Sequence, residues 1–271
     1  MADLRIGCSG WVYRHWKGGV FYPEGLRAAD ELAYYATRFS TAELNGTFYR
    51  LPTDKAVDGW RERTPDDFVF AWKASRYLTH QKRLKEPDDS VALMFSRAER
   101  LGEKLGCVLY QLPPSMKRDD ERLAAALKVL PRHRRHAFEF RDPSWYEAPV
   151  FELLREYDVS LCLSDHHHAP APWEATASWV YVRGHGPTGG YWGSYADETL
   201  ARWAAQIRLW RAEGRDVFCY FDNDIGGAAP QDADRLTALV EAGSNAPPSE
   251  RRRRLAGGSA ADVRPSWPGL S

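Results

Sequence analysis

Eight short runs of strand-forming residues recur along the 271-residue chain, and helix-like stretches separate most of them. A strand followed by a helix, repeated this many times, predicts a parallel sheet, and eight such units close into a (β/α)8 barrel. The alternative fold is an open doubly wound sheet, but Gly7–Gly10 lacks the glycine spacing of a dinucleotide-binding fingerprint. The eight runs are Leu4–Cys8, Thr41–Asn45, Phe68–Lys73, Cys107–Gln111, Ala137–Arg141, Val159–Ser164, Trp179–Arg183 and Val217–Phe221.

The stretches between the runs carry helix signals. Apolar residues from Leu26 to Phe39 follow one stripe with a helical period. Thr53 is placed to cap a helix, Pro131 stops another, and Pro149 suits the first turn of a third. Between the sixth and seventh runs the chain reads Ser-Asp-His-His-His-Ala-Pro-Ala-Pro. We therefore predict a short or missing helix at that connection.

Composition and charge predict how the chain is divided, which partners it has and where it is located. We predict one barrel domain over residues 1–245 and a disordered basic tail over 246–271, which contains the run Arg251–Arg254. Lys plus Arg equals Asp plus Glu at 37 each, so no global field favours nucleic acid as a partner. The start of the chain lacks a signal peptide and no apolar run could span a bilayer, which predicts a cytoplasmic protein with no membrane partner. The four separated cysteines are expected to be buried thiols.

Strand alternation predicts charges inside the barrel. In the second, fifth and seventh runs, polar residues share one face and apolar residues share the other. The apolar faces belong under helices, so we expect the polar faces to point inward. Buried ion pairs seldom stabilise a protein more than apolar packing does, so we interpret the charged cluster as functional. Its members, near the carboxyl ends of the runs, are Glu43, Lys73, Glu139, Arg141 and Arg183.

The inward charges and the aromatic residues of nearby loops predict an enzyme that acts on a small anionic substrate, such as a phosphorylated or acidic sugar. The cations would hold the anion and the carboxylates would move protons, while His185 suits acid-base chemistry and aromatic rings can stack on a sugar. The predicted catalytic residues are Glu43, Lys73, Glu139 and His185. The predicted substrate-binding residues are Trp11, Asn45, Tyr49, Gln111, Arg141, Trp145, Arg183, Tyr191 and Asn223.

Two other functions stay open. A divalent-metal-dependent isomerase or phosphodiesterase-like barrel would use Glu43, Glu139, Asp165 and His185 as ligands, although three cations at the same place would repel the ion. A non-catalytic module would bind nucleic acid or protein through exposed aromatic residues and the basic run. Three consecutive histidines, His166–His168, cannot all face one ion, so we interpret them as an exposed loop. No metal residue and no cofactor is predicted.

Several segments follow one another along the chain in an order that is typical of a known family. They include Gly7-Cys8-Ser9-Gly10-Trp11, Glu43-Leu44-Asn45-Gly46-Thr47-Phe48-Tyr49-Arg50, Phe70-Ala71-Trp72-Lys73-Ala74, Thr79-His80, Gln111-Leu112-Pro113-Pro114, Phe138-Glu139-Phe140-Arg141, Tyr181-Val182-Arg183 and Tyr220-Phe221-Asp222-Asn223-Asp224. From about Ile6 to Leu239 the chain thus resembles the domain of unknown function family 72, also called YecE-like proteins. The resemblance implies a TIM-type barrel, but it implies no reaction. The chain has Gly46, Asp142 and Asp222 where the family usually has Ser, His and Asn.

Overall fold

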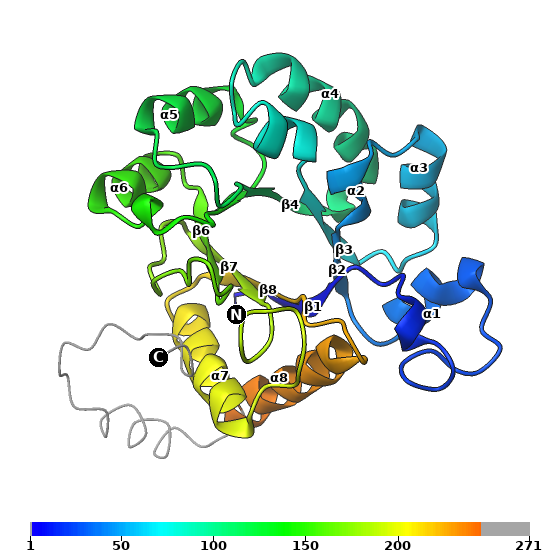
Figure 1. Ribbon diagram of the computed structural model, residues 1–271. Helices are drawn as coiled ribbons and strands as arrows, with labels where there is room; N and C mark the ends of the chain where they lie inside the picture. The colour runs from blue at the N-terminus through cyan, green and yellow to red at the C-terminus, as the bar shows by residue number, and fades with distance from the viewer. Residues whose placement is uncertain (1, 245–271) are drawn as a thin grey trace.

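Eight parallel strands form one closed barrel in chain order in the computed structural model, which describes residues 2–244 (Figure 1). Pairing of β8 with β1, from Leu4 opposite Val217 to Cys8 opposite Phe221, closes the ring. The predicted (β/α)8 barrel is therefore confirmed, with strand ends that differ from the expected ones by at most two residues. The strands are β1 (Leu4–Ser9), β2 (Thr41–Leu44), β3 (Val69–Lys73), β4 (Leu105–Gln111), β5 (His136–Glu139), β6 (Ser160–Ser164), β7 (Trp179–Gly184) and β8 (Asp216–Phe221).

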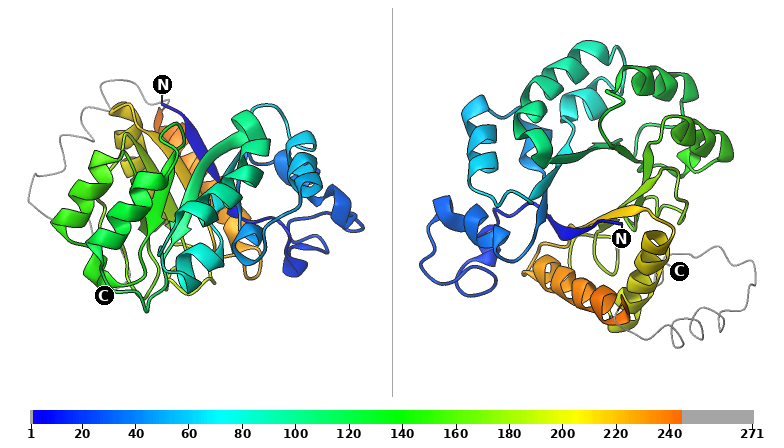
Figure 2. Two further views of the ribbon diagram at one scale, coloured as in Figure 1. Left: turned by 90° about the horizontal axis from the view of Figure 1, so that it is seen from above. Right: turned by 180° about the vertical axis from the view of Figure 1, so that it is seen from behind.

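Helices surround this barrel and run along its outer side (Figure 2). As predicted, Thr53 caps a helix by accepting from the Ala56 amide at 3.3 Å, and residues 165–178 between β6 and β7 contain no helix. The α-helices are α1 (Glu31–Ala36), α2 (Gly46–Tyr49), α3 (Asp54–Glu62), α4 (Asp88–Ala98), α5 (Asp120–Val129), α6 (Ala148–Glu156), α7 (Asp197–Ala212) and α8 (Ala228–Ser244). Shorter 3₁₀ segments span Arg14–Trp16, Ala28–Asp30, Glu99–Lys104 and Pro143–Trp145, and a π-helix spans Tyr77–Gln81.

The long helix expected over 26–39 is wrong. A 3₁₀ turn over Ala28–Asp30 comes first, and α1 then ends at Ala36. The chain tightens at that end because the Thr37 amide donates to the Tyr34 carbonyl at 3.0 Å, three residues back rather than four. The predicted tail lies outside the described residues.

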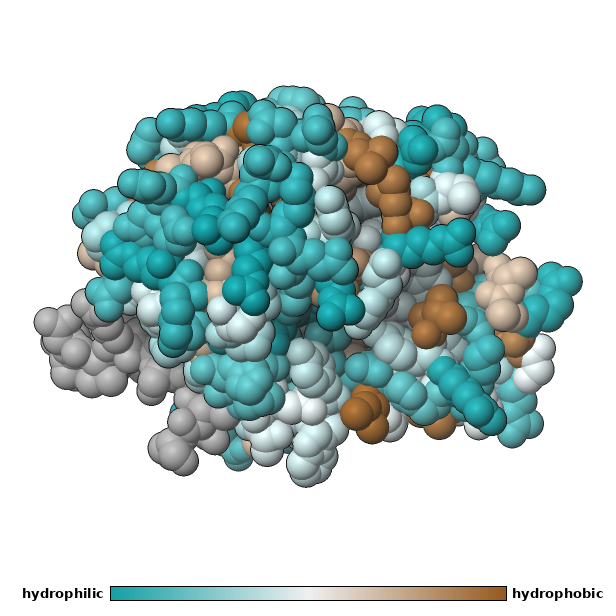
Figure 3. Space-filling view, turned by 45° about the horizontal axis from the view of Figure 1, so that its top comes forward, coloured by the Kyte–Doolittle hydropathy of each residue, from teal (hydrophilic) through white to brown (hydrophobic). Residues whose placement is uncertain are grey.

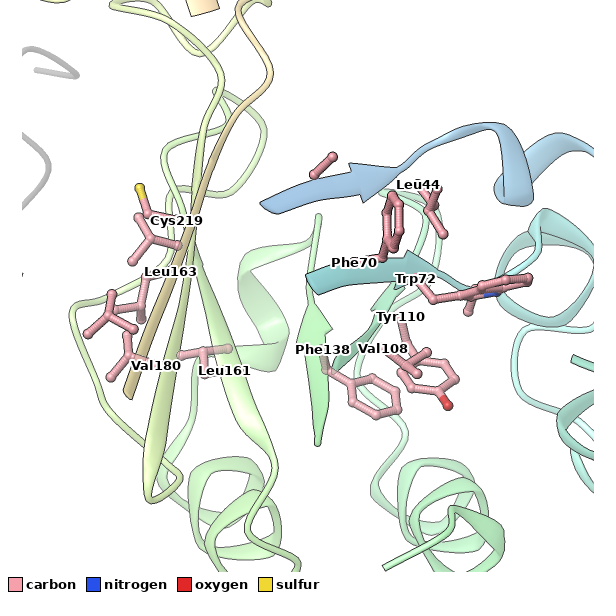
Figure 4. Packing of buried hydrophobic residues seen from close by; sticks show 14 of the residues in the cluster. Leu44, Phe70, Trp72, Val108, Tyr110, Phe138, Leu161, Leu163, Val180 and Cys219 are labelled. Carbon is pink, nitrogen blue, oxygen red and sulfur yellow. The ribbon is translucent and has the colours of Figure 1, made fainter. Parts of the chain in front are cut away.

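Apolar side chains on the outer faces of the strands pack under the helices. Figure 4 shows Trp72 of β3, Tyr110 of β4 and Phe138 of β5 on the outer side of the strands, and all three are buried. A smaller cluster that includes Ala137, Cys162 and Tyr181 fills the interior, so the alternation assigned from the sequence is the observed one. The four cysteines are free and buried, as expected. The face drawn in Figure 3 is mostly hydrophilic, with separate apolar groups.

We find no helix within residues 2–244 that combines the length and the apolar character needed to cross a bilayer.

Gly7 allows β1 and β2 to approach each other closely. A Cβ atom at this position would lie 2.3 Å from the Thr41 carbonyl oxygen and 2.9 Å from the Tyr35 hydroxyl. That hydroxyl joins the strands, because it accepts from the Cys8 amide at 2.8 Å and donates to the Thr41 carbonyl at 2.9 Å. A side chain at Gly7 would therefore separate the first two strands of the barrel.

We expect Gly7→Ala to lower the free energy of unfolding by about 2 kcal/mol or more, as overpacking does. Gly59→Ala is the matched control, because a Cβ atom there meets nothing within 4 Å and the position lies inside α3. Alanine favours the helix, so this variant should be neutral or stabilised by up to about 1 kcal/mol. Urea unfolding followed by circular dichroism measures both, and equal values would contradict the assigned role of Gly7.

Candidate functional site

The Arg183 guanidinium is fully buried among carboxylates near the carboxyl ends of the strands. Its Nε donates to Glu43 Oε2 at 3.0 Å, and its Nη1 donates to Glu139 Oε2 at 2.8 Å. Its Nη2 donates to Ser9 Oγ, Glu43 Oε1 and Asp222 Oδ2, at 2.8, 2.7 and 2.8 Å. With the His185 ring as a further acceptor, all N–H groups of Arg183 have partners. We call Arg183 with Ser9, Glu43, Glu139 and Asp222 the Arg183 network.

Glu43 and Glu139 point into the barrel, as predicted. They come from β2 and β5, which are not neighbours in the sheet, so they can meet Arg183 of β7 only in the interior. Burial alone would raise the pKa of each carboxyl, but the neighbouring cations outweigh it. The pKa of Glu43 is lowered mainly by Arg183, and that of Glu139 falls to about 2 beside Arg141 and Arg183. Both side chains are therefore ionised and have no exposed surface.

Arg141 and His185 extend the Arg183 network toward β6. Arg141 binds Glu139 through Nε, and its other nitrogens contact the Tyr191 hydroxyl at 3.1 Å and His185 Nε2 at 3.1 Å. Arginine only donates, so His185 Nε2 must accept, and the proton of the neutral ring is assigned to Nδ1. Burial, with Arg141 and Arg183 beside it, holds the pKa of His185 well below its usual value.

Asp165 lies behind His185 and is shielded from solvent. Its Oδ1 accepts from the His185 amide at 2.6 Å, and its Oδ2 accepts from the Tyr195 hydroxyl. Burial raises the pKa of Asp165 to about 7, although the hydrogen bond from Tyr195 opposes the rise. The expectation of an exposed histidine loop is wrong in part, because His166 is 3% exposed and packs 5.2 Å from the His185 ring. His167 and His168 are exposed.

A cavity of about 800 Å³ lies beside the Arg183 network, at the carboxyl ends of the strands. Aromatic rings line much of it, and Trp11 and Trp60 meet edge to face with their centroids 6.1 Å apart. Its lining side chains also include Tyr13, Asn45, Phe48, Tyr49, Lys73, Arg76, His80, Gln111, Tyr191, Asp222 and Asp224. The cavity therefore combines aromatic rings with polar and charged side chains.

Lys73 is the last residue of β3, and its charged side chain lines this cavity, as expected of an inward-pointing residue. Its side chain is 8% exposed, and Nζ lies 5.0 Å from the centre of the Phe48 ring. Within residues 2–244 its ammonium group has neither a hydrogen bond nor an ion-pair partner. Burial lowers the pKa of Lys73 to about 8, and the charge of Arg183 adds to this effect.

The structure divides the predicted site residues into three groups. Trp11, Asn45, Tyr49, Lys73, Gln111 and Tyr191 line the cavity. Glu43, Glu139, Arg141, Arg183 and His185 form the buried layer beside it, and Trp145 and Asn223 hold loops.

Trp145 and Asn223 are fully buried and do not line the cavity, which corrects their expected position. The Trp145 ring stacks on Phe140 and donates to the Met116 carbonyl at 2.8 Å. Asn223 donates to the Gly193 carbonyl at 2.7 Å and so connects the loops that follow β7 and β8.

Arg76, His80 and Asp224 also line the cavity, and the sequence reasoning did not select them. Arg76 and His80 belong to the loop after β3, which contains the π-helix Tyr77–Gln81, and π-helical turns are frequent at functional sites. Burial lowers the pKa of His80 to about 4, with Lys73 as a further cause, and it raises the pKa of Asp224 to about 6. The rule that loops after barrel strands form the site could have identified all three.

Residues 5–254 match the family described as "Protein of unknown function DUF72". The chain belongs to the DUF72 family. A DUF72 relative, UPF0759 protein YunF of Bacillus subtilis (strain 168), is 26% identical over 276 residues, covering 88% of this chain and 95% of that protein. UPF0759 protein YecE of Escherichia coli (strain K12) is 32% identical over 144 residues, which cover 53% of this chain and 50% of that protein.

Solved structures of DUF72 proteins share the barrel. A DUF72 family protein of Thermotoga maritima aligns with a TM-score of 0.79 and 27% identity, over 88% of this chain and 99% of its own. Another from Enterococcus faecalis gives a TM-score of 0.72 at 20% identity, over 89% of this chain and 98% of its own, and supports the fold alone. The recognition made from the sequence motifs is therefore confirmed.

Removing one carboxylate of the Arg183 network should destabilise this DUF72 protein strongly. We expect Glu139→Gln to lower the free energy of unfolding by about 3 to 5 kcal/mol, because Arg141 and Arg183 would lose a buried counter-charge. The matched control is Glu174→Gln in the exposed pair with Arg155, which should cost about 1 kcal/mol or less. If Glu139→Gln unfolds at the wild-type urea concentration, the network does not stabilise the barrel.

Asp165 should make stability depend on pH. Its pKa is higher in the folded state than in the unfolded chain, so its contribution is present at low pH and is lost as the pH rises through about 7. The stability of Asp165→Asn relative to wild type should therefore increase by about 2 to 3 kcal/mol from pH 5 to pH 8. Urea unfolding at the two pH values measures this change, and exposed Asp66→Asn is the control. A constant difference would contradict the raised pKa.

Proposed function

We propose that this DUF72 protein is an enzyme for a small anionic, sugar-like substrate that binds in the cavity at the carboxyl ends of the strands. One observation carries the proposal: Lys73 and Arg76 line the cavity, and neither has an ion pair within the described residues. An anionic group on a ligand would supply the missing counter-charge.

The anion contact is assigned to Lys73 and Arg76 rather than to Arg141 and Arg183. Every N–H group of Arg183 already has a hydrogen-bond partner. The carboxylates of Glu43, Glu139 and Asp222 also balance its positive charge. Arg141 is bound to Glu139, Tyr191 and His185 and is not among the residues that line the cavity. A phosphate or carboxylate placed against Arg183 would have to displace a buried carboxylate, which is costly.

The walls of the cavity favour a sugar-like ligand. Trp11 and Trp60 present apolar faces, which stack on the C–H surfaces of a sugar ring. Asn45 donates to the Ser9 carbonyl at 3.0 Å, while its own Oδ1 has no donor among the described residues. A hydroxyl group could donate to this oxygen, because buried acceptors are normally paired.

The groups best placed to move protons are Asp222 and Asp224, because both line the cavity. Burial raises the pKa of Asp222 although Arg183 opposes the rise, and it raises that of Asp224 to about 6. With a pKa of about 6, Asp224 is suited to general acid-base catalysis near neutral pH. Glu43 and Glu139, the carboxylates expected to do this, stay ionised and bound to arginine.

The alternatives have less support. For the metal-dependent barrel, Glu43 and Glu139 are already bound to Arg183, and Asp165 is bound to Tyr195. Within residues 2–244 we find no group of three or more His, Cys, Asp or Glu side chains arranged to hold a metal ion. For the nucleic-acid or protein module, the basic run lies outside the described residues and the formal net charge of the chain is zero.

Inorganic phosphate should raise the melting temperature of the wild-type protein at constant ionic strength, since a ligand that binds only the folded state stabilises it. Lys73→Gln and Arg76→Gln should each weaken phosphate binding by about tenfold or more, because each removes one charged donor. Arg202→Gln is the matched control, since Arg202 is exposed on α7, and it should bind phosphate as the wild type does. A wild-type protein that does not respond to phosphate or sulfate would overturn the anion site.

A further inference from the structure

The Lys73 side chain is held where an amine can meet a bound ligand. Its Cα pairs with Leu109 of β4 in the barrel wall, and the side chain is more than nine-tenths buried. The ammonium group still borders the cavity, at 5.0 Å from the Phe48 ring centre. No carboxylate within the described residues pairs with it, so its nitrogen is not committed to a structural role.

We propose that Lys73 Nζ forms a Schiff base with an aldehyde or keto group of the anionic substrate, whose charged end is held by Arg76. The inference rests on the proposed function and adds to it the chemical class of the reacting group. Arg76 follows Lys73 by three residues and lines the same cavity, so both cations can engage one small molecule.

The electrostatic surroundings favour an amine that reacts. Only the neutral amine is a nucleophile, and burial beside the Arg183 charge lowers the pKa of Lys73 to about 8. Lysines activated in this way are typical of enzymes that bind carbonyl substrates covalently. The four cysteine thiols are buried, and none lines this cavity.

The step balances without an oxidant or a reductant. The nitrogen lone pair attacks the carbonyl carbon, the C–N bond forms, and the carbonyl π electrons move to oxygen, which takes a proton. The nitrogen loses a proton, the hydroxyl is protonated and leaves as water, and the nitrogen lone pair forms the C=N bond. One amine, one carbonyl and one proton thus give one protonated imine and one water. Asp222 and Asp224, which line the cavity, are the carboxyls that can exchange these protons.

Reductive trapping tests the inference on the full chain. The carbonyl probe is glyceraldehyde 3-phosphate with sodium cyanoborohydride, which reduces an imine to a stable secondary amine. The control probe is glycerol 3-phosphate, which carries the same anion and has no carbonyl group. Peptide mapping by mass spectrometry then locates the modified lysines.

We expect the reduced adduct on Lys73 to form about ten times or more faster than on exposed Lys55, because the pKa of Lys73 is lowered to about 8 and the cavity holds the probe beside its amine. Inorganic phosphate should slow the reaction of Lys73 and leave that of Lys55 unchanged. Glycerol 3-phosphate should give no adduct at either residue.

Lys73→Arg separates the Schiff base from the anion site, because it keeps the positive charge but removes the amine. This variant should still be stabilised by phosphate and should lose the fast adduct. If phosphate stabilises the wild type but Lys73 reacts no faster than Lys55, the Schiff base is overturned and the anion site remains. If Lys73 reacts fast and phosphate neither competes nor stabilises, the Schiff base is supported and the anionic substrate is overturned.

Discussion

The fully buried guanidinium of Arg183 sets the conditions for the rest of the site. Removing a charge from water costs several kcal/mol unless the protein replaces the lost hydration. Here the replacement comes from Glu43 of β2, Glu139 of β5 and Asp222 after β8. These elements lie on different sides of the barrel, so satisfying one side chain of β7 fixes the positions of several strand ends at once.

This requirement separates charges that hold the structure from charges that are available for chemistry. Glu43 and Glu139 are ionised and bound to arginine, and His185 is neutral and fully buried beside them. Lys73 lies at the border of this layer, where burial and the charge of Arg183 lower its pKa, and it has no ion pair within residues 2–244. The buried layer therefore lowers the pKa of the Lys73 amine without forming an ion pair with it.

The motif segments that carry the family resemblance also build most of the site. They contribute both the Arg183 network and much of the cavity wall, including Trp11, Asn45 and Lys73. Asp222, which follows β8, is the third carboxylate that contacts Arg183, and it also lines the cavity. The buried network and the cavity therefore share side chains.

The sequence by itself determined the barrel, the strand ends to within two residues, and the inward direction of Glu43, Glu139 and Arg183. These features follow from the periods of strands and helices, which depend only on residues that are close together in the sequence. Which charges pair was decided only by the tertiary structure. The distances between β2, β5 and β7 depend on how the ring closes, so only the closed barrel shows that Arg183 is saturated and that Lys73 has no ion pair within residues 2–244. The same reason explains Trp145, whose place under a loop depends on packing against Phe140 and Met116 rather than on its distance from a strand end.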